Sequence, residues 1–176
     1  GKQAGEIALK ALPNGGKCIG FVGLPGADNA RERIEGMKAT IAGSKVELID
    51  VRGDDINFER AKRNVEDALA ANPDIECMVG FYSYNPPYIY NVLKESGKLG
   101  KVTIIAFDED PITLGGVREG TIAGTVVQQP YEWGYQGMKL VAKVLEKDMS
   151  GIPENKLVIV PTKIIDKSNV DAFEAE

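Results

Sequence analysis

Residues 17–36 read KCIGFVGLPGADNARERIEG, and this stretch decides the fold. It begins with a continuous apolar run at 18–22, turns through residues 24–26, and continues into a segment in which Ile34 and Met37 recur at helical spacing. A short apolar run without alternation is typical of a strand that is buried on both faces of a parallel sheet. A tight turn that contains Gly and Pro, followed by an amphipathic helix, indicates the beginning of a strand–helix–strand unit.

The same alternation continues along the chain. The further apolar runs that we expect to form strands occupy residues 46–51, 75–81, 102–107, 125–128 and 157–160. Amphipathic helical patterns separate most of these runs, and another such pattern precedes the first strand and stops at residues 13–16, PNGG. The sequence therefore predicts an α/β protein with a doubly wound parallel sheet and helices on both faces. In such sheets, ligands bind outside the carboxyl ends of the strands.

Composition excludes several classes of function. The net charge of −5 provides no basic surface of the kind that nucleic-acid binding requires. No apolar run approaches the roughly 20 residues of a membrane span, so we expect no membrane insertion. The chain has no histidine, which removes Ser-His-Asp and Cys-His catalysis together with most zinc sites. We therefore expect no enzymatic activity, no metal and no cofactor.

The chain has two cysteines, Cys18 and Cys77, each at or near the start of an apolar run. We expect the two runs to lie side by side in one sheet. Two buried thiols are the favoured interpretation, and a disulfide remains open because adjacent parallel strands rarely offer its geometry.

Polar and aromatic side chains gather where the predicted strands end. These loops are residues 24–26, 53–55, 82–85, 108–110 and 128–130. The first could form a phosphate cradle, but its glycines fit no complete phosphate-binding motif, so a tight strand-to-helix turn is favoured. Acidic residues such as Asp54, Asp55 and Glu109 are expected to be solvated surface.

Four blocks of the sequence resemble one known family. In chain order they are GLPGADNARERIEG, ANPDIECMVGFYSYN, VTIIAFDEDP and GTVVQQPYEWGYQGMKLVAKVL. They resemble the ribose-type substrate-binding proteins of sugar ABC transporters, over residues 5 to about 166. The resemblance implies the periplasmic binding protein type I fold, in which each lobe is a flavodoxin-like half.

The resemblance also implies a set of ligand contacts. Polar contacts fall on Arg33, Asn85, Asp108 and Gln128, an apolar contact falls on Leu24, and an aromatic one falls on Phe58, with Ile56 as its alternative. The chemistry suits a sugar, because a carboxylate only accepts hydrogen bonds, a guanidinium only donates them and amides do both. Aromatic faces suit the C–H faces of a sugar ring, which adds Tyr84, with Tyr82 and Tyr88, as a candidate wall of the site.

Each of these residues also has a simpler interpretation. Arg33 alone could be a solvated helix residue, and Asn85 and Asp108 could cap the helices that follow them. Gln129 competes with Gln128, because neighbouring side chains on a strand point to opposite faces. The coincidence of all these residues at one edge of the sheet favours a binding site.

The resemblance further implies the domain organisation and the function. Residues 1–128 with 160–176 correspond to the C-terminal lobe, and residues 129–159 to a returning segment of an N-terminal lobe that is otherwise missing, which could pair two chains as a swapped dimer. The implied function is the substrate-binding component of a bacterial sugar ABC transporter, which binds a monosaccharide between two lobes and docks on an ABC permease. Its location would be the periplasm, or the outer surface of a Gram-positive cell through a lipid anchor. The alternative is the effector-binding core of a LacI-type transcriptional repressor.

Overall fold

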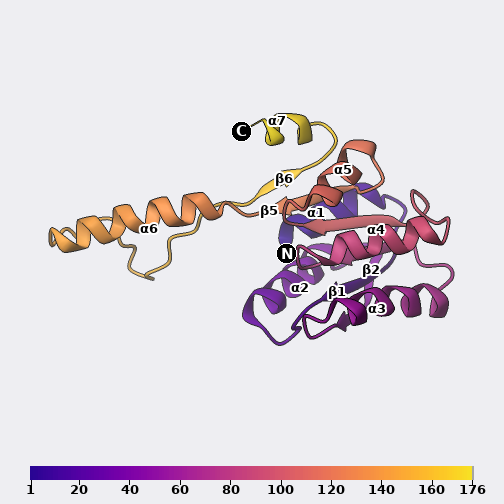
Figure 1. Cartoon of the computed structure of the whole chain (residues 1–176). Coiled ribbons are helices and arrows are strands. Elements are labelled where there is room, and N and C mark those ends of the chain that lie inside the picture. Colours follow the sequence, from indigo (N-terminus) through magenta and orange to yellow (C-terminus); the bar gives the residue numbers. More distant parts are fainter. Residues whose placement is uncertain (176) are drawn as a thin grey trace. The chain divides into compact units, whose positions relative to one another are not determined.

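Strands and helices alternate along the computed structural model, which describes residues 1–175 (Figure 1). The strands are β1 (Gly16–Val22), β2 (Val46–Gly53), β3 (Cys77–Gly80), β4 (Thr103–Phe107), β5 (Gly124–Val127) and β6 (Lys163–Ile165). The helices are α1 (Lys2–Ala11), α2 (Asp28–Ile41), α3 (Phe58–Ala71), α4 (Asn85–Glu95), α5 (Pro111–Glu119), α6 (Pro130–Leu145) and α7 (Val170–Glu174).

The strands form one sheet in the order β2-β1-β3-β4-β5-β6. The pairs β1–β2, β1–β3, β3–β4 and β4–β5 are all parallel. The chain winds outward from β1 in both directions, so the topological switch point lies between β1 and β3. The predicted doubly wound α/β fold is confirmed, and its carboxyl edge is where a ligand is expected.

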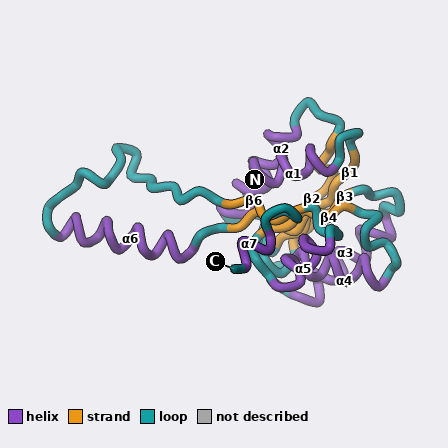
Figure 2. Tube along the Cα trace, turned by 90° about the horizontal axis from the view of Figure 1, so that it is seen from above, coloured by secondary structure: helices purple, strands orange, loops and turns teal. Residues whose placement is uncertain are grey.

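Helices cover both faces of this sheet (Figure 2). Helices α1 and α2 pack on one face, where Ile7 and Met37 are buried against strand residues such as Val79 and Ile105. Helices α3, α4 and α5 lie on the other face. Burial on both faces explains why the strands are apolar without alternation.

The two cysteines are direct neighbours in the sheet, as the sequence predicts for their strands. Cys18 on β1 is in register with Cys77 on β3. Both are free thiols and fully buried, and burial raises the pKa of the Cys77 thiol.

The chain divides into two compact units. Unit 1 comprises Gly1–Val126 and the stretch from Ile164 onward, and unit 2 comprises Val127–Lys163. Within unit 2, residues 157–160 do not form the strand predicted from their apolar run. A strand needs a neighbour to satisfy its backbone hydrogen bonds, and the described part of unit 2 offers none to this stretch.

Apolar side chains on α6 are exposed, among them Met138, Val141 and Leu145. Some of them line a pocket of about 510 Å³ inside unit 2, together with Met149 and Val158.

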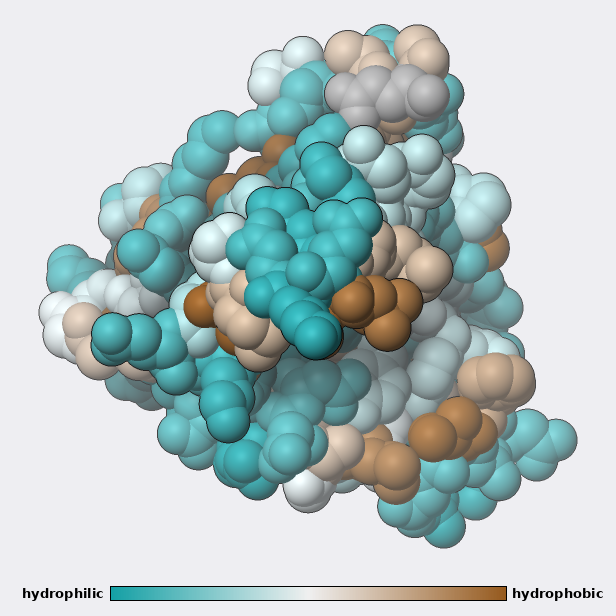
Figure 3. Space-filling model, turned by 90° about the vertical axis from the view of Figure 1, so that its left-hand side faces the viewer, coloured by the Kyte–Doolittle hydropathy of each residue, from teal (hydrophilic) through white to brown (hydrophobic). Residues whose placement is uncertain are grey.

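On the face of the molecule in Figure 3, hydrophilic side chains predominate and hydrophobic ones gather in separate clusters. In residues 1–175, no helix is both long enough and apolar enough to cross a membrane.

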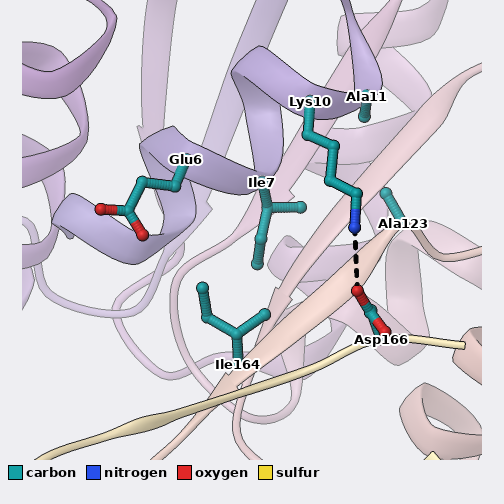
Figure 4. Close-up of a pocket in the computed structure, with 7 residues that line it drawn as sticks. All are labelled: Glu6, Ile7, Lys10, Ala11, Ala123, Ile164 and Asp166. Atoms are coloured by element: carbon teal, nitrogen blue, oxygen red, sulfur yellow. Dashed lines mark hydrogen bonds and ion pairs between the residues drawn. The ribbon is translucent and has the colours of Figure 1, made fainter. Parts of the chain in front are cut away.

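The last segment of the chain returns to unit 1 beside α1. Lys10 reaches from α1 to Asp166, directly after β6, with 3.0 Å between Nζ and Oδ2 (Figure 4). The side chains of Ile7 and Ile164 face each other in the same pocket, whose volume is about 410 Å³. The amide and hydroxyl of Ser168 also donate to Asp166.

We expect the free energy of unfolding to depend less on pH under acidic conditions in Asp166→Asn than in the wild type. Hydrogen bonds from Ser168, and then the contact with Lys10, lower the pKa of Asp166 from 3.8 to about 2 in the folded chain. Because the pKa is lower in the folded state than in the unfolded state, the carboxylate stabilises the fold above pH ~4, and this contribution is lost as the pH falls through about 2. Urea denaturation across this range measures the effect, and Ser168→Ala should reproduce part of it. Parallel profiles for wild type and Asp166→Asn would contradict the assignment.

Candidate ligand-binding site

Five of the residues predicted for the site lie close to the carboxyl edge of the sheet in unit 1. Helix α2 supplies Arg33 and the end of β4 supplies Asp108. The loop after β3 leads into Tyr84 and Asn85, and α3 begins with Phe58. The parallel arrangement brings these segments together because every strand presents its carboxyl end to the same edge.

Arg33 and Asp108 face each other at this edge. Their nearest charged atoms, Nη1 and Oδ2, are 3.7 Å apart, and the side chains are only 12% and 19% exposed. The guanidinium of Arg33 also donates to the carbonyl of Phe81 and lies 4.7 Å from the centre of the Phe107 ring. Contact with an aromatic face favours a cation. Arg33 is therefore a fixed donor, and its interpretation as a solvated helix residue is wrong.

The backbone of Asp108 is held in an unusual conformation. Its φ is +67°, in the left-handed region that most side chains avoid. Its amide donates to Val126 O at 2.9 Å, and its carbonyl accepts from the hydroxyl of Thr125 at 2.7 Å. Asp108 does not cap the following helix, because Asp110 accepts from the Ile112 amide in that role.

The side chain of Asn85 is buried, with 2% exposure. Its Oδ1 accepts from the Tyr82 amide at 3.1 Å, and its Nδ2 donates to Asp54 Oδ2 at 2.9 Å. Both ends of the amide are therefore engaged inside the protein, which suits a supporting role next to the ligand.

Asp54 is a residue that the sequence interpretation missed. The sequence pattern predicts a solvated surface residue, but the structure buries Asp54 to 1% exposure. Besides Asn85, its carboxylate accepts from the Ile56 amide at 2.9 Å and from the Tyr84 hydroxyl at 2.6 Å. A signal was present in its position, since Asp54 follows a strand end at the same edge as the other candidates.

Aromatic rings form a cluster beside Asp54. The ring of Phe58 meets that of Tyr84 edge-on at 5.1 Å and stacks on Tyr88 at 6.1 Å. Burial, and then the hydrogen bond to Asp54, raises the pKa of the Tyr84 phenol. Gly23 lets the rings approach the end of β1, because a Cβ there would lie 2.7 Å from the Tyr84 hydroxyl.

The remaining candidates are more peripheral. Leu24 is 41% exposed in the loop after β1, and Ile56, the alternative to Phe58, is 52% exposed, close to the 53% of Phe58 itself. Gln128 follows β5 and belongs to unit 2. Its competitor Gln129 donates to Pro161 O at 2.6 Å within the same unit.

The edge is acidic, and its acids do not cluster around a metal position. Burial, and then the charge of Asp108, raises the pKa of the Glu109 carboxyl. Across residues 1–175, no group of three or more His, Cys, Asp or Glu side chains could hold a metal ion. The edge presents a guanidinium, a carboxylate and aromatic rings, which are groups that can contact a polar ligand.

Comparison with known proteins agrees with this architecture. The family described as "Periplasmic binding protein domain" matches residues 1–149, and the chain belongs to this family. The ribose import binding protein of Salmonella typhimurium is 30% identical over 90% of this chain and 54% of the relative. The xylose/arabinose-binding protein of Sulfolobus acidocaldarius is 25% identical over 98% of this chain and 43% of the relative. The chain thus spans about half the length of these curated relatives.

Solved structures share the fold. A periplasmic solute-binding protein from Actinobacillus succinogenes with bound D-allose aligns over 97% of this chain and 60% of that one, with a TM-score of 0.87 and 20% identity. A solute-binding protein from Burkholderia graminis in complex with D-arabinose aligns over 96% and 60%, with a TM-score of 0.82 and 28% identity. The resemblance to ribose-type binding proteins is confirmed.

We expect Asp108→Ala to be less stable than Asp108→Asn by about 1 kcal/mol, because Asn tolerates left-handed backbone and Ala does not. Both variants remove the charge that faces Arg33, so the difference between them reports the backbone preference together with the side-chain contacts that only Asn keeps. Urea denaturation of the two variants at neutral pH measures this difference. Equal free energies of unfolding would show that the positive φ of Asp108 costs nothing.

Proposed function

We propose that this chain binds a monosaccharide at its carboxyl edge, as part of the substrate-binding component of a bacterial sugar ABC transporter. The observation that carries the proposal is the half-buried Arg33–Asp108 pair, which lies at the edge where parallel α/β sheets bind ligands. The names of the relatives support a sugar, since they specify ribose and xylose or arabinose. Both relatives are named as binding proteins, and the name of the Salmonella relative also specifies import, which favours the receptor over the repressor alternative.

Each side chain has a distinct role in this proposal. Asp108 accepts from sugar hydroxyls and Arg33 donates to them, and hydrogen bonds to charged groups are the stronger ones. The rings of Phe58 and Tyr84 face the C–H groups of the sugar. Asn85 supports the edge from within. Leu24 and Gln128 remain proposed contacts that rest on the resemblance.

The rest of the proposal concerns the whole protein. Residues 1–128 with 160–176 form one lobe, and residues 129–159 belong to a second lobe that closes over the sugar. The sugar binds the closed form better than the open one and so increases the population of the closed form. An ABC permease recognises this closed form. The protein acts without catalysis, in the periplasm or attached by lipid outside a Gram-positive cell.

Asp108→Asn should weaken sugar binding by at least about tenfold, because a charge-assisted hydrogen bond to a hydroxyl is lost while the backbone is kept. Calorimetry with pentoses and hexoses, on the protein at its full natural length, measures the affinity. The matched control is Asp74→Asn, whose carboxylate is 75% exposed before β3, at the amino edge of the sheet. Unchanged affinity in Asp108→Asn would remove Asp108 from the site, and no binding by the wild type would refute the proposed function.

The exposed apolar side chains of α6 need a cover. Val141, Val144 and Leu145 line the pocket in unit 2 together with Leu140, and contiguous apolar surface of this kind marks an interaction site. The 176-residue chain spans about half the length of its relatives. We propose that, in this chain, the exposed apolar side chains of α6 pack against a second copy of the same chain. An exchange of unit 2 between copies is a low-cost route to such a dimer.

The 176-residue chain should therefore sediment as a dimer, and Val141→Glu should shift it toward monomer by placing a charge in the apolar contact. Lys139→Ala, on the same helix but outside the lining of the pocket, is the control and should leave the dimer intact. A monodisperse wild-type monomer in sedimentation equilibrium would refute the exchange.

A further inference from the structure

We propose that Asp54 is the positioning residue of the binding edge, which fixes Arg33 through Asn85 and the peptide group between Phe81 and Tyr82. The inference rests on the proposed function in one respect, because Arg33 is taken to contact the sugar. Asp54 itself is 1% exposed, so it acts on the ligand through these intermediates.

The link begins at the peptide group that joins Phe81 to Tyr82. Its carbonyl accepts from Nη1 of Arg33, and its N–H donates to Oδ1 of Asn85 at 3.1 Å. The two groups lie in one rigid plane. A rotation of this plane that breaks the bond to Asn85 therefore also moves the acceptor that holds Arg33.

Asp54 decides which way the Asn85 amide points. A carboxylate only accepts, so Asn85 must present Nδ2 to Asp54 Oδ2, and these two atoms are 2.9 Å apart. This leaves Oδ1 of Asn85 for the amide of Tyr82. The carboxylate of Asp54 is itself oriented, because its Oδ1 accepts from the Ile56 amide and the Tyr84 hydroxyl. Every bond in the chain thus has one allowed direction.

The same carboxylate fixes both ends of the site. Through Tyr84 it holds the ring that Phe58 packs against. Through Asn85 it reaches Arg33, which in turn faces Asp108. Burial of an ion is costly unless donors surround it, and the three donors here supply that compensation.

The donor-to-acceptor direction of the hydrogen bonds between Asp54, Asn85 and Tyr82 can be tested with matched substitutions. In Asp54→Asn, an amide nitrogen replaces one carboxylate oxygen. This nitrogen is a donor, and it must face another donor, which is either Nδ2 of Asn85 or the Ile56 amide with the Tyr84 hydroxyl. In Asn85→Asp, two carboxylates face each other. The double variant Asp54→Asn/Asn85→Asp restores the links to position 54 and to Tyr82, because the amide introduced at position 54 donates to the carboxylate introduced at position 85, which still accepts from Tyr82. Only the contact of the Asn85 amide with the Tyr84 hydroxyl is not restored.

Sugar affinity is measured by calorimetry on the protein at its full natural length, at a temperature where circular dichroism shows every variant folded. Each single variant is expected to weaken binding by about tenfold, because a displaced Arg33 loses a charge-assisted hydrogen bond to the sugar. The double variant is expected to recover most of this affinity. In parallel, nuclear magnetic resonance without sugar follows the Arg33 Nε–H and Tyr82 amide signals, which should move in both single variants. In the double variant the Arg33 signal should return.

Single variants with wild-type affinity would overturn the inference, and so would a double variant no better than the single ones. If Asp54 were only structural, the single variants would lose stability while the Arg33 signal and the affinity stayed unchanged. If the wild type bound none of the sugars, the proposed function would fail, and the Arg33 and Tyr82 signals would still decide whether Asp54 positions Arg33.

Discussion

The peptide group between Phe81 and Tyr82 is the constraint on which the carboxyl edge depends. It directly follows β3, in the middle of the sheet. Arg33 bonds to it from α2 and Asn85 from α4, and these helices cover opposite faces (Figure 2). One planar group therefore connects the two helical layers at the point where polar side chains gather. Its carbonyl holds Arg33 together with the carboxylate of Asp108 and the ring of Phe107.

A buried carboxylate in such a place has a physical reason. Where parallel strands end, backbone amides and helix beginnings leave donors that need acceptors. Asp54 satisfies the Ile56 amide, the Tyr84 hydroxyl and the Asn85 amide at once. The network is fully satisfied, which makes it rigid, and rigidity at a binding edge reduces the ordering cost of binding. In the proposed site, Asp54 and its three donors would therefore orient the groups at this edge before a ligand binds.

Much of the candidate site could be predicted from the sequence. The strand ends identify the edge, and the four blocks that resemble ribose-type proteins single out Arg33 and Asp108, which the structure places 3.7 Å apart. The part that could not be predicted concerns burial. Asp54 and Asn85 are 31 residues apart along the chain, and their contact depends on how β2 and the loop after β3 come together. Sequence patterns indicate the spacing of apolar residues within one segment, and they do not indicate which polar side chains from different segments meet.

The sequence by itself determined the parallel α/β fold, because continuous apolar runs separated by amphipathic helices have few other ways to be buried. It also determined the edge at which the polar residues gather. Only the tertiary structure decided that Asp110 rather than Asp108 caps α5, that Asn85 is turned inward and that Asp54 is buried. It also left residues 157–160 without strand structure. These outcomes depend on which partner a polar or apolar group meets across the fold, and such partners come from distant parts of the chain.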